Sequence, residues 1–408
     1  MVAIFSAAAA GTDTSAVLDD LARQIGARRA AGGCVFAFYG CDHDDEAVRR
    51  FLGTRFPAAC YVGGTSCNGV MTEQGMIGPD SIGLLLIDDP DGDYGAAAAP
   101  LGDDPAGTAE TLLRAALVDA DCPGQLPELV WIFQAPGHEE EVVEGLRRVV
   151  GDRCPIIGGS AADNTVSGQW RQIARNGVYA EGLAVAVLFS SGGIGYSFQG
   201  GYEPAGPSGV VTRVGFDPDG QSGIVTKSYG RAVLTIDNAP AAEVYNGWIG
   251  DRLESAVRNG GNILRDTTMC PLAVDVGEVD GIQNYLLIHP EAVLPNGGLR
   301  LFASVDEGTR IYSMRGDEGR LVERAGRVAM QAASRLPAGP GSLAGGLVVY
   351  CAGCMLAVGE RMPDVARGVA DGFAGAPFLG CFTFGEQGCV VDRNMHGNLM
   401  ISAIAFGR

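Results

Sequence analysis

The chain has 408 residues with a formal net charge of −19, and 47% of its residues are hydrophobic. This length and apolar content predict a folded protein of two or three domains rather than a disordered chain. The acidic balance argues against binding to nucleic acid, which depends on Lys and Arg contacts with phosphates, and against docking on anionic lipid. No stretch approaches the roughly 20 apolar residues of a membrane-spanning helix, and the start lacks the basic region of a signal peptide, so a cytoplasmic protein is expected.

A strand–helix–strand–turn–strand pattern occurs three times, over about residues 30–90, 125–190 and 345–408. The first unit reads GGCVFAFYG, DDEAVRRFLGTRF, PAACYVGGTSCNG and SIGLLLI, and the second reads ELVWIFQAPG, HEEEVVEGLRRVV, RCPIIGGSAADN and GLAVAVLFS. The third reads GGLVVYCAG, MPDVARGVADGF, GAPFLGCFTFGEQG and NLMISAIAFG. Apolar strands that alternate with amphipathic helices predict an α/β or α+β fold of helix-covered sheets.

In each unit a turn of small residues follows a short buried strand, at its carboxyl end. Open α/β sheets tend to bind ligands at that edge, so the repeated turns are candidate pocket walls. A tight turn in which Gly permits positive φ is the plain alternative. The first two turns supply the candidate ligand-binding residues Gly64, Thr65, Ser66, Cys67, Gly159 and Ser160.

A different region separates the second and third units, at about residues 196–345. GGYEPAGPSGV is rich in Gly and Pro and predicts a turn or boundary. The segment from Gly223 to Gly250 predicts two strands and then a helix, with Asn238 near the N-cap and Pro240 in the first turn. The boundary between two halves is expected near residues 200–225, which gives domains 1–210 and 211–408.

The third turn and the strand after it hold polar and reactive side chains of several kinds. Glu386 could bind a ligand amine, act as a general base, or accept N–H bonds within its own turn. In an enzyme acting on a small metabolite, Cys381 would be the nucleophile and would need a base such as His396. Without catalysis, the ligand-binding residues expected here are Cys381, Thr383, Gly385, Glu386, His396 and Asn398.

The eleven cysteines are expected to be reduced, because several lie inside apolar runs. Cys351 and Cys354 form a CxxC pair, and a structural zinc site usually needs four ligands. Cys381 and Cys389 could supply the other two, which makes a thiolate metal site the third alternative. No phosphate-binding loop, GxGxxG, GxSxG or HExxH motif is present, so an ATPase or a dinucleotide enzyme is not expected.

Nearly the whole chain resembles the FIST family, with an N-terminal and a C-terminal FIST half. VGGTSCNGVMTEQG and IIGGSAADN resemble the glycine-rich turns of the N half, and the segment around Pro240, Ala241 and Tyr245 resembles the family's sequence at the join. LVVYCAGCMLAVGER and FLGCFTFGEQGCV, with the HGNLMISAIAFG that follows, resemble motifs of the C half.

The resemblance implies a small-ligand sensory module that acts beside signal-transduction partners. Some FIST proteins bind haem and report nitric oxide to histidine kinases, and others have been suggested to bind amino acids. His396 matches the motif histidine, so it is the expected axial ligand if haem binds. No output domain is recognised in the chain, so a separate protein such as a histidine kinase is the expected partner.

Three departures from the family pattern suggest a different ligand. Cys354 stands where the family has an arginine, and Gln387 and Cys389 replace an apolar residue and a proline. In the first unit, the acidic position after the turn is not kept.

Overall fold

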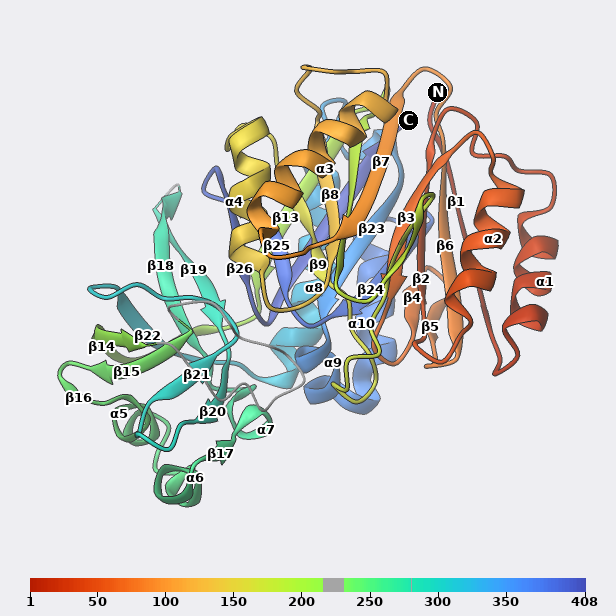
Figure 1. Ribbon diagram of the computed structural model, residues 1–408. Coiled ribbons are helices and arrows are strands. Elements are labelled where there is room, and N and C mark those ends of the chain that lie inside the picture. Colours follow the sequence, from red (N-terminus) through yellow and green to blue (C-terminus); the bar gives the residue numbers. More distant parts are fainter. Residues whose placement is uncertain (216–230, 280) are drawn as a thin grey trace.

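Three copies of one structural unit follow one another along the chain, and the third copy carries a large insertion (Figure 1). The computed structural model describes residues 1–215, 231–279 and 281–408. Each unit runs strand, helix, strand, helix, strand, two-strand hairpin, strand, so the expected α/β class is confirmed. Among the described residues no helix is both long and apolar enough to cross a membrane.

The first two units are continuous in sequence. The first comprises β1 (Ala3–Ala10), α1 (Thr14–Ile25), β2 (Cys34–Tyr39), α2 (Asp45–Arg55), β3 (Cys60–Thr65), β4 (Val70–Thr72), β5 (Gly75–Ile77) and β6 (Ser81–Asp88). The second comprises β7 (Asp93–Pro100), α3 (Pro105–Asp119), β8 (Leu129–Gln134), α4 (Glu139–Val150), β9 (Ile156–Ser160), β10 (Gln172–Ala174), β11 (Gly177–Tyr179) and β12 (Gly182–Phe189).

The third unit is interrupted after its first strand. Its elements are β13 (Ile194–Gly200), α8 (Glu318–Ser334), β23 (Leu343–Cys351), α9 (Ala352–Val358), α10 (Met362–Gly372), β24 (Phe378–Thr383), β25 (Glu386–Val390), β26 (Arg393–Gly397) and β27 (Met400–Gly407), with short 3-10 turns at Pro340–Ser342 and Gly359–Arg361. Because β13 pairs with β27, residues of the predicted N half and C half share one sheet.

The inserted region, meaning the described residues between 201 and 317, forms a separate sheet with its own apolar core. It lies to one side of the three units, drawn in green to teal in Figure 1. Its elements are β14 (Glu203–Gly215), β15 (Ala232–Ile236), β16 (Ala239–Pro240), α5 (Ala241–Trp248), α6 (Glu254–Asn259), β17 (Gly261–Asn262), α7 (Leu264–Thr267), β18 (Leu272–Val279), β19 (Ile282–Ile288), β20 (Pro290–Val293), β21 (Leu299–Leu301) and β22 (Arg310–Arg315).

The three units exchange their hairpins in a closed cycle. The hairpin β4–β5 of the first unit pairs with β24 of the third, β10–β11 of the second pairs with β3 of the first, and β25–β26 of the third pairs with β9 of the second. The resulting sheets have the orders β1-β6-β2-β3-β10-β11, β26-β25-β9-β8-β12-β7 and β13-β27-β23-β24-β4-β5. No unit can complete its sheet alone, so the three units are expected to fold as one body.

Alternation along the strands explains how each sheet is covered. In β2, Phe36 and Phe38 face a core shared by all three sheets, while Val35 and Tyr39 face α1 and α2. Phe36 meets Trp131 of β8 edge to face, with ring centroids 5.3 Å apart. The helix pairs α3–α4 and α8–α10 cover the other two sheets. The core is therefore continuous between units, which brings their strand ends together.

The strands and helices expected within the three units are confirmed, but each unit begins earlier than predicted. Each has a leading strand, and the first two are rich in alanine, a residue depleted in strands, so the pattern was missed. The turn expected in GGYEPAGPSGV is wrong, because β14 runs through it with a register shift between Pro204 and Ser208. Pro240 is the N-cap of α5 rather than a residue of its first turn, and residues 216–230 of the first expected strand lie outside the described residues.

Gly158 tests the close approach of parallel strands in these units. An ideal Cβ at Gly158 would lie 1.8 Å from the carbonyl oxygen of Ile132 on β8, and Gly63 shows the same approach to Ala37 in the first unit. Gly158→Ala is expected to lower the free energy of unfolding by about 3 kcal/mol, because strand backbone must move. Urea denaturation measures this change. Gly341→Ala, where a Cβ meets open space, is the matched control, and equal stability of the two variants would contradict the assignment.

Candidate functional site

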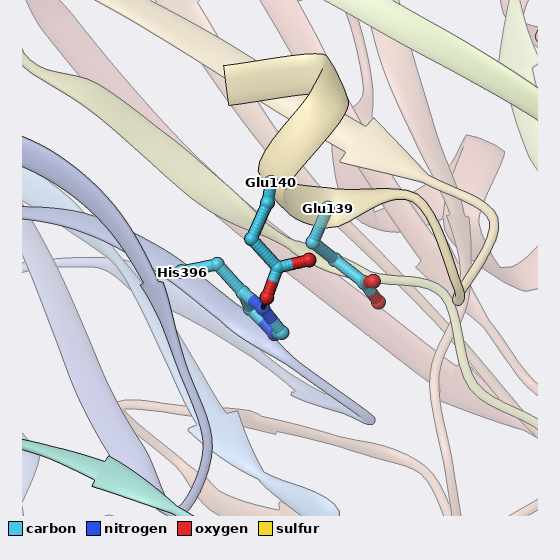
Figure 2. A group of neighbouring side chains, drawn as sticks. All are labelled: Glu139, Glu140 and His396. Atoms are coloured by element: carbon cyan, nitrogen blue, oxygen red, sulfur yellow. Dashed lines mark hydrogen bonds and ion pairs between the residues drawn. The ribbon is translucent and has the colours of Figure 1, made fainter. Parts of the chain in front are cut away.

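A largely buried cluster of charged side chains, in which only Glu140 is as much as 33% exposed, lies where the three units meet the inserted region. Glu139 and Glu140 begin α4, Arg231 precedes β15, and His396 lies near the end of β26. Figure 2 shows the Glu140 carboxylate pointing at the His396 ring, with Glu139 beside it. These four residues are called the ionic junction below.

The Glu139 carboxylate accepts hydrogen bonds from a serine hydroxyl, a backbone N–H and an arginine. Ser160 Oγ donates to Oε1 at 2.7 Å, and the Gly137 N–H donates to Oε2 at 3.0 Å. Arg231 Nη2 lies 2.8 Å from the same Oε2, and the side chains of Glu139 and Arg231 are only 4% and 2% exposed. The arginine of the inserted region is therefore held by the first turn of α4.

Glu140 joins three parts of the chain. Its carboxylate accepts a bond from Arg231 Nη2, and its Oε1 accepts the Ser304 N–H at 2.9 Å and lies 3.1 Å from His396 Nδ1. Burial alone would raise the pKa of Glu140 and of Glu139, but Arg231 and then His396 outweigh it. The pKa of Glu139 is lowered and that of Glu140 is held well below its usual range, so both are carboxylates.

Among the described residues, Arg231 Nη2 forms an ion pair with each of the two carboxylates. A buried charge is costly unless it is paired, and removal of one partner leaves the other uncompensated. Among the described residues its Nε has no hydrogen-bond partner although the atom is buried. The junction therefore keeps one unused donor inside the protein.

His396 links the junction to the inserted region through Asn398. Its Nε2 lies 3.4 Å from Asn398 Nδ2, and Asn398 Oδ1 accepts the His289 N–H at 3.2 Å. The Asn398 N–H donates to the carbonyl of Leu287 on β19 at 3.0 Å. An ideal Cβ at Gly385 would lie 2.7 Å from His396 Nε2, so only glycine leaves room for the ring.

Glu386 lies beside the junction as a separate buried carboxyl. Thr383 Oγ1 donates to its Oε1 at 2.8 Å, and the Met400 N–H donates to its Oε2 at 3.1 Å. Burial, and then the neighbouring Cys351, raise its pKa well above the usual range. The expected N–H bonds from its own turn are not observed among these contacts, because the donor from the turn is the Thr383 hydroxyl and the N–H donor, Met400, lies on β27.

The three repeated turns meet one another, as the ligand-pocket hypothesis requires. The N–H of Ser160 donates to Gly385 O at 2.8 Å, and the N–H of Phe384 donates back to Ser160 O at 3.1 Å. The first turn joins them through the Cys67 N–H, which donates to Phe382 O at 3.1 Å. Gly64, Thr65, Ser66 and Gly159 are buried in the same region. Ser66 Oγ donates a hydrogen bond to the carbonyl of Gly69, and Thr65 Oγ1 accepts one from the Arg171 N–H.

The reactive cysteines are not brought into one site. Cys351 and Cys354 pack in one apolar cluster, Cys381 packs in another, and Cys389 belongs to neither. Burial raises the pKa of the thiols of Cys351, Cys381 and Cys389, which makes them poor thiolate ligands or nucleophiles. His396 bonds with Glu140 and Asn398, not with Cys381.

The metal donors that do converge are those of Glu139, Glu140 and His396, which lie within 4.8 Å of one another among the described residues. Arg231 already supplies the positive charge there, so a divalent cation would have to displace it. A haem does not fit His396 as it stands, because the side chain is 1% exposed and Nε2 faces Gly385 and Asn398. Haem ligation by His396 therefore stays a prediction from the resemblance.

Three members of the junction were missed from the sequence. Glu139 and Glu140 stand at the carboxyl end of a buried strand, the edge where ligands were expected, and that placement was the available signal. Arg231 has no local signal, because its partners lie more than 90 residues away. His43 is buried outside this site, and its Nδ1 lies 3.0 Å from Thr14 Oγ1.

His289, which anchors Asn398, provides a pH test of this region. Burial lowers its pKa to about 4, and Nε2 bonds with Leu264 O. Between its unfolded pKa of about 6.5 and this folded value the unfolded chain binds more protons, so stability falls as pH falls.

The wild type is expected to lose about 2 to 3 kcal/mol more than His289→Gln between pH 7 and pH 4.5. Urea denaturation across that pH range measures the difference. Parallel pH profiles for the two proteins would contradict the assignment of a neutral buried imidazole.

Comparison with known proteins gives a family and solved structures of low similarity. Among solved structures, a cyanuric acid hydrolase from A. caulinodans aligns over 100% of both chains with 11% identity and a TM-score of 0.37. PurLQS from Thermotoga maritima covers 77% of this chain and 72% of its own, with 10% identity and a TM-score of 0.19. Both TM-scores are too low to show a shared fold. No curated protein matches the chain.

The family models match in the order that the sequence motifs suggest. The FIST N domain model matches residues 33–215, which include the first two hairpins and β13. The FIST C domain model matches residues 241–389, which include most of the inserted region and the strand that carries Thr383. Together these matches cover most of the described fold, and the chain belongs to the FIST family.

Proposed function

We propose that this protein is a small-ligand-binding sensory protein and that the ionic junction converts ligand binding into a change of conformation. FIST domains are associated with small-ligand-binding signal-transduction proteins. The observation that carries the proposal is Arg231, a buried arginine of the inserted region that pairs with two adjacent carboxylates of the three-unit body. A structural role alone would be served as well by apolar packing.

The junction is suited to coupling because its members come from two parts of the chain. The inserted region has a core of its own and the three units share another, while a further apolar cluster joins the inserted region to the third unit. Only a ligand that binds two arrangements with different affinity shifts their populations. Rearrangement of Arg231, Glu140 and His396 would change how the inserted region is held.

The ligand itself is a small molecule, and the convergent turns supply the polar groups for it. The unused Nε of Arg231 can donate to a ligand oxygen, and Glu140 can accept from a ligand amine, so an amino acid fits this chemistry. The output would pass to a separate signalling protein, such as a histidine kinase. These assignments rest on the family and on the side chains present.

The enzyme alternative has less support from the geometry. Cys381 is fully buried in an apolar cluster, and no hydrogen bond joins it to His396 among the described residues. Nucleophilic catalysis needs an activated thiolate and a base within hydrogen-bond reach. A ligand site is therefore the preferred function.

Glu140→Gln tests whether the ionic junction transmits ligand binding, for ligands that the variant still binds. We expect ligands from a panel of amino acids and other small metabolites to raise the melting temperature of the wild type. Hydrogen exchange should then change both in β26–β27 and in β20–β21 of the inserted region. The Gln variant keeps the shape of the side chain but loses the charge that holds Arg231 and His396. The change of hydrogen exchange should then occur in only one of the two regions, β26–β27 or β20–β21.

Glu110→Gln is the matched control, because Glu110 makes an i,i+4 ion pair with Arg114 on the surface of α3. It should transmit the change as the wild type does. Full transmission in Glu140→Gln, with ligand bound, would refute the role of the junction.

A further inference from the structure

A groove with a cavity volume of about 620 Å³ separates α8 from the inserted hairpin β18–β19. Its walls come from both bodies: Phe198 and Met400 from the three units, Tyr285, Leu287 and Met314 from the inserted region. This volume is typical of small-molecule sites. The groove is separate from the ionic junction and has no assigned role.

Arg324 of α8 supplies the charged group of this groove. It is half-buried, and its Nη1 donates to Gln199 Oε1 at 2.9 Å. Among the described residues it makes no ion pair. Burial, and then the nearby Arg327 and Arg320, lower its pKa, as expected for a cation without a counter-charge.

The neighbouring arginines of α8 differ in having acidic partners. Arg327 Nη2 lies 2.9 Å from Glu323 Oε2, and Arg320 pairs with Glu203 and Asp317. Arg324 is thus the cation of this helix face that is left without a carboxylate. In a chain with a net charge of −19, an unpaired and half-buried arginine beside a groove needs an explanation.

Gln199 holds the guanidinium in place through a short polar row. Gln331 Oε1 accepts from Ser197 Oγ at 2.7 Å and from Gln199 Nε2, which leaves Gln199 Oε1 directed at Arg324. The rest of the lining is mixed: Arg327, Gln283, Asn284 and Ser334 lie beside apolar side chains, and Met330 and Ile282 are 56% and 68% exposed. Arg327 is paired with Glu323. One fixed, unpaired cation beside apolar side chains is a site for an amphipathic anion.

We propose that this groove binds a small monocarboxylate with an apolar body, whose carboxylate pairs with Arg324. The planar guanidinium matches a carboxylate in two parallel hydrogen bonds. A phosphate dianion fits less well, because Arg327, the other arginine of the groove, is already paired with Glu323 and Arg324 would neutralise only one of the two charges. The aromatic and methionine side chains would contact the apolar body.

This inference deepens the proposed sensory function and rests on it for its consequence. Leu287 lines the groove and its carbonyl accepts the Asn398 N–H, while Met400 lines the groove and its N–H donates to Glu386. Asn398 contacts His396. A ligand in the groove would therefore contact two strands, β19 and β27, that are linked to His396 of the ionic junction through Asn398.

Isothermal titration calorimetry on the full chain with octanoate and 3-phenylpropionate tests the site. We expect both to bind, and octanamide, which has the same body without the charge, to bind at least about tenfold more weakly. Arg324→Met should weaken octanoate binding about 10- to 100-fold and leave octanamide nearly unchanged. Arg324→Gln provides the same test if the Met variant is poorly folded.

Arg258→Met, which removes an exposed arginine of α6 that pairs with Glu254, is the matched control and should bind octanoate as the wild type does. Absence of carboxylate binding at millimolar concentration, or equal binding by Arg324→Met, would overturn the proposal. Equally tight, Arg324-dependent binding of inorganic phosphate would overturn the requirement for an apolar body.

The two proposals can fail separately. Arg324-dependent octanoate binding without any change of hydrogen exchange at the ionic junction would support the groove and count against the sensory role. If carboxylates do not bind but a different metabolite changes hydrogen exchange at the ionic junction, the sensory role is supported and the proposed ligand of the groove is wrong.

Discussion

The pairing of one buried guanidinium with two adjacent carboxylates ties the inserted region to the rest of the protein. Arg231 reaches Glu139 and Glu140 at the start of α4, where the backbone N–H groups of a helix also favour negative charge. Such an arrangement removes hydration from Arg231 and Glu139 and part of it from Glu140, and it is held by mutual attraction, so each group depends on the others. It is stable in one geometry and sensitive to displacement, which suits a sensing element.

The exchange of hairpins between units brings His396 next to these paired side chains. Since β25–β26 of the third unit completes the sheet of the second, His396 arrives beside α4, more than 250 residues earlier in the chain. The same exchange brings the three small-residue turns into contact, so much of their glycine content is architectural. Gly385 has a specific partner as well, because a side chain there would collide with the His396 ring, as one at Gly159 would with Thr383.

Local pattern was enough to predict the secondary structure of the units. Strands such as Cys34–Tyr39 and helices such as Asp45–Arg55 follow from apolar periodicity and N-cap residues. Local pattern did not predict the alanine-rich leading strands or the course of β14 through a Gly/Pro-rich segment. In both places pairing with neighbouring strands overrides a weak strand propensity.

The site was predicted only in part, for a related reason. His396, Asn398, Glu386 and Ser160 could be singled out because they lie in the repeated turn or close after it. The ion pairs of Arg231 and the groove beside Arg324 depend on contacts between segments that are far apart in the sequence. Neither hydrophobic periodicity nor motif spacing predicts such contacts.

A double-mutant cycle between Arg231→Met and Glu140→Gln tests the central claim most directly. The free energy of unfolding of the wild type, both single variants and the double variant would be measured by urea denaturation at pH 7. The ionic junction predicts a coupling energy of at least about 2 kcal/mol, since each group is costly to bury without the other. Additivity within about 0.5 kcal/mol would show that the two side chains act independently and would contradict the account.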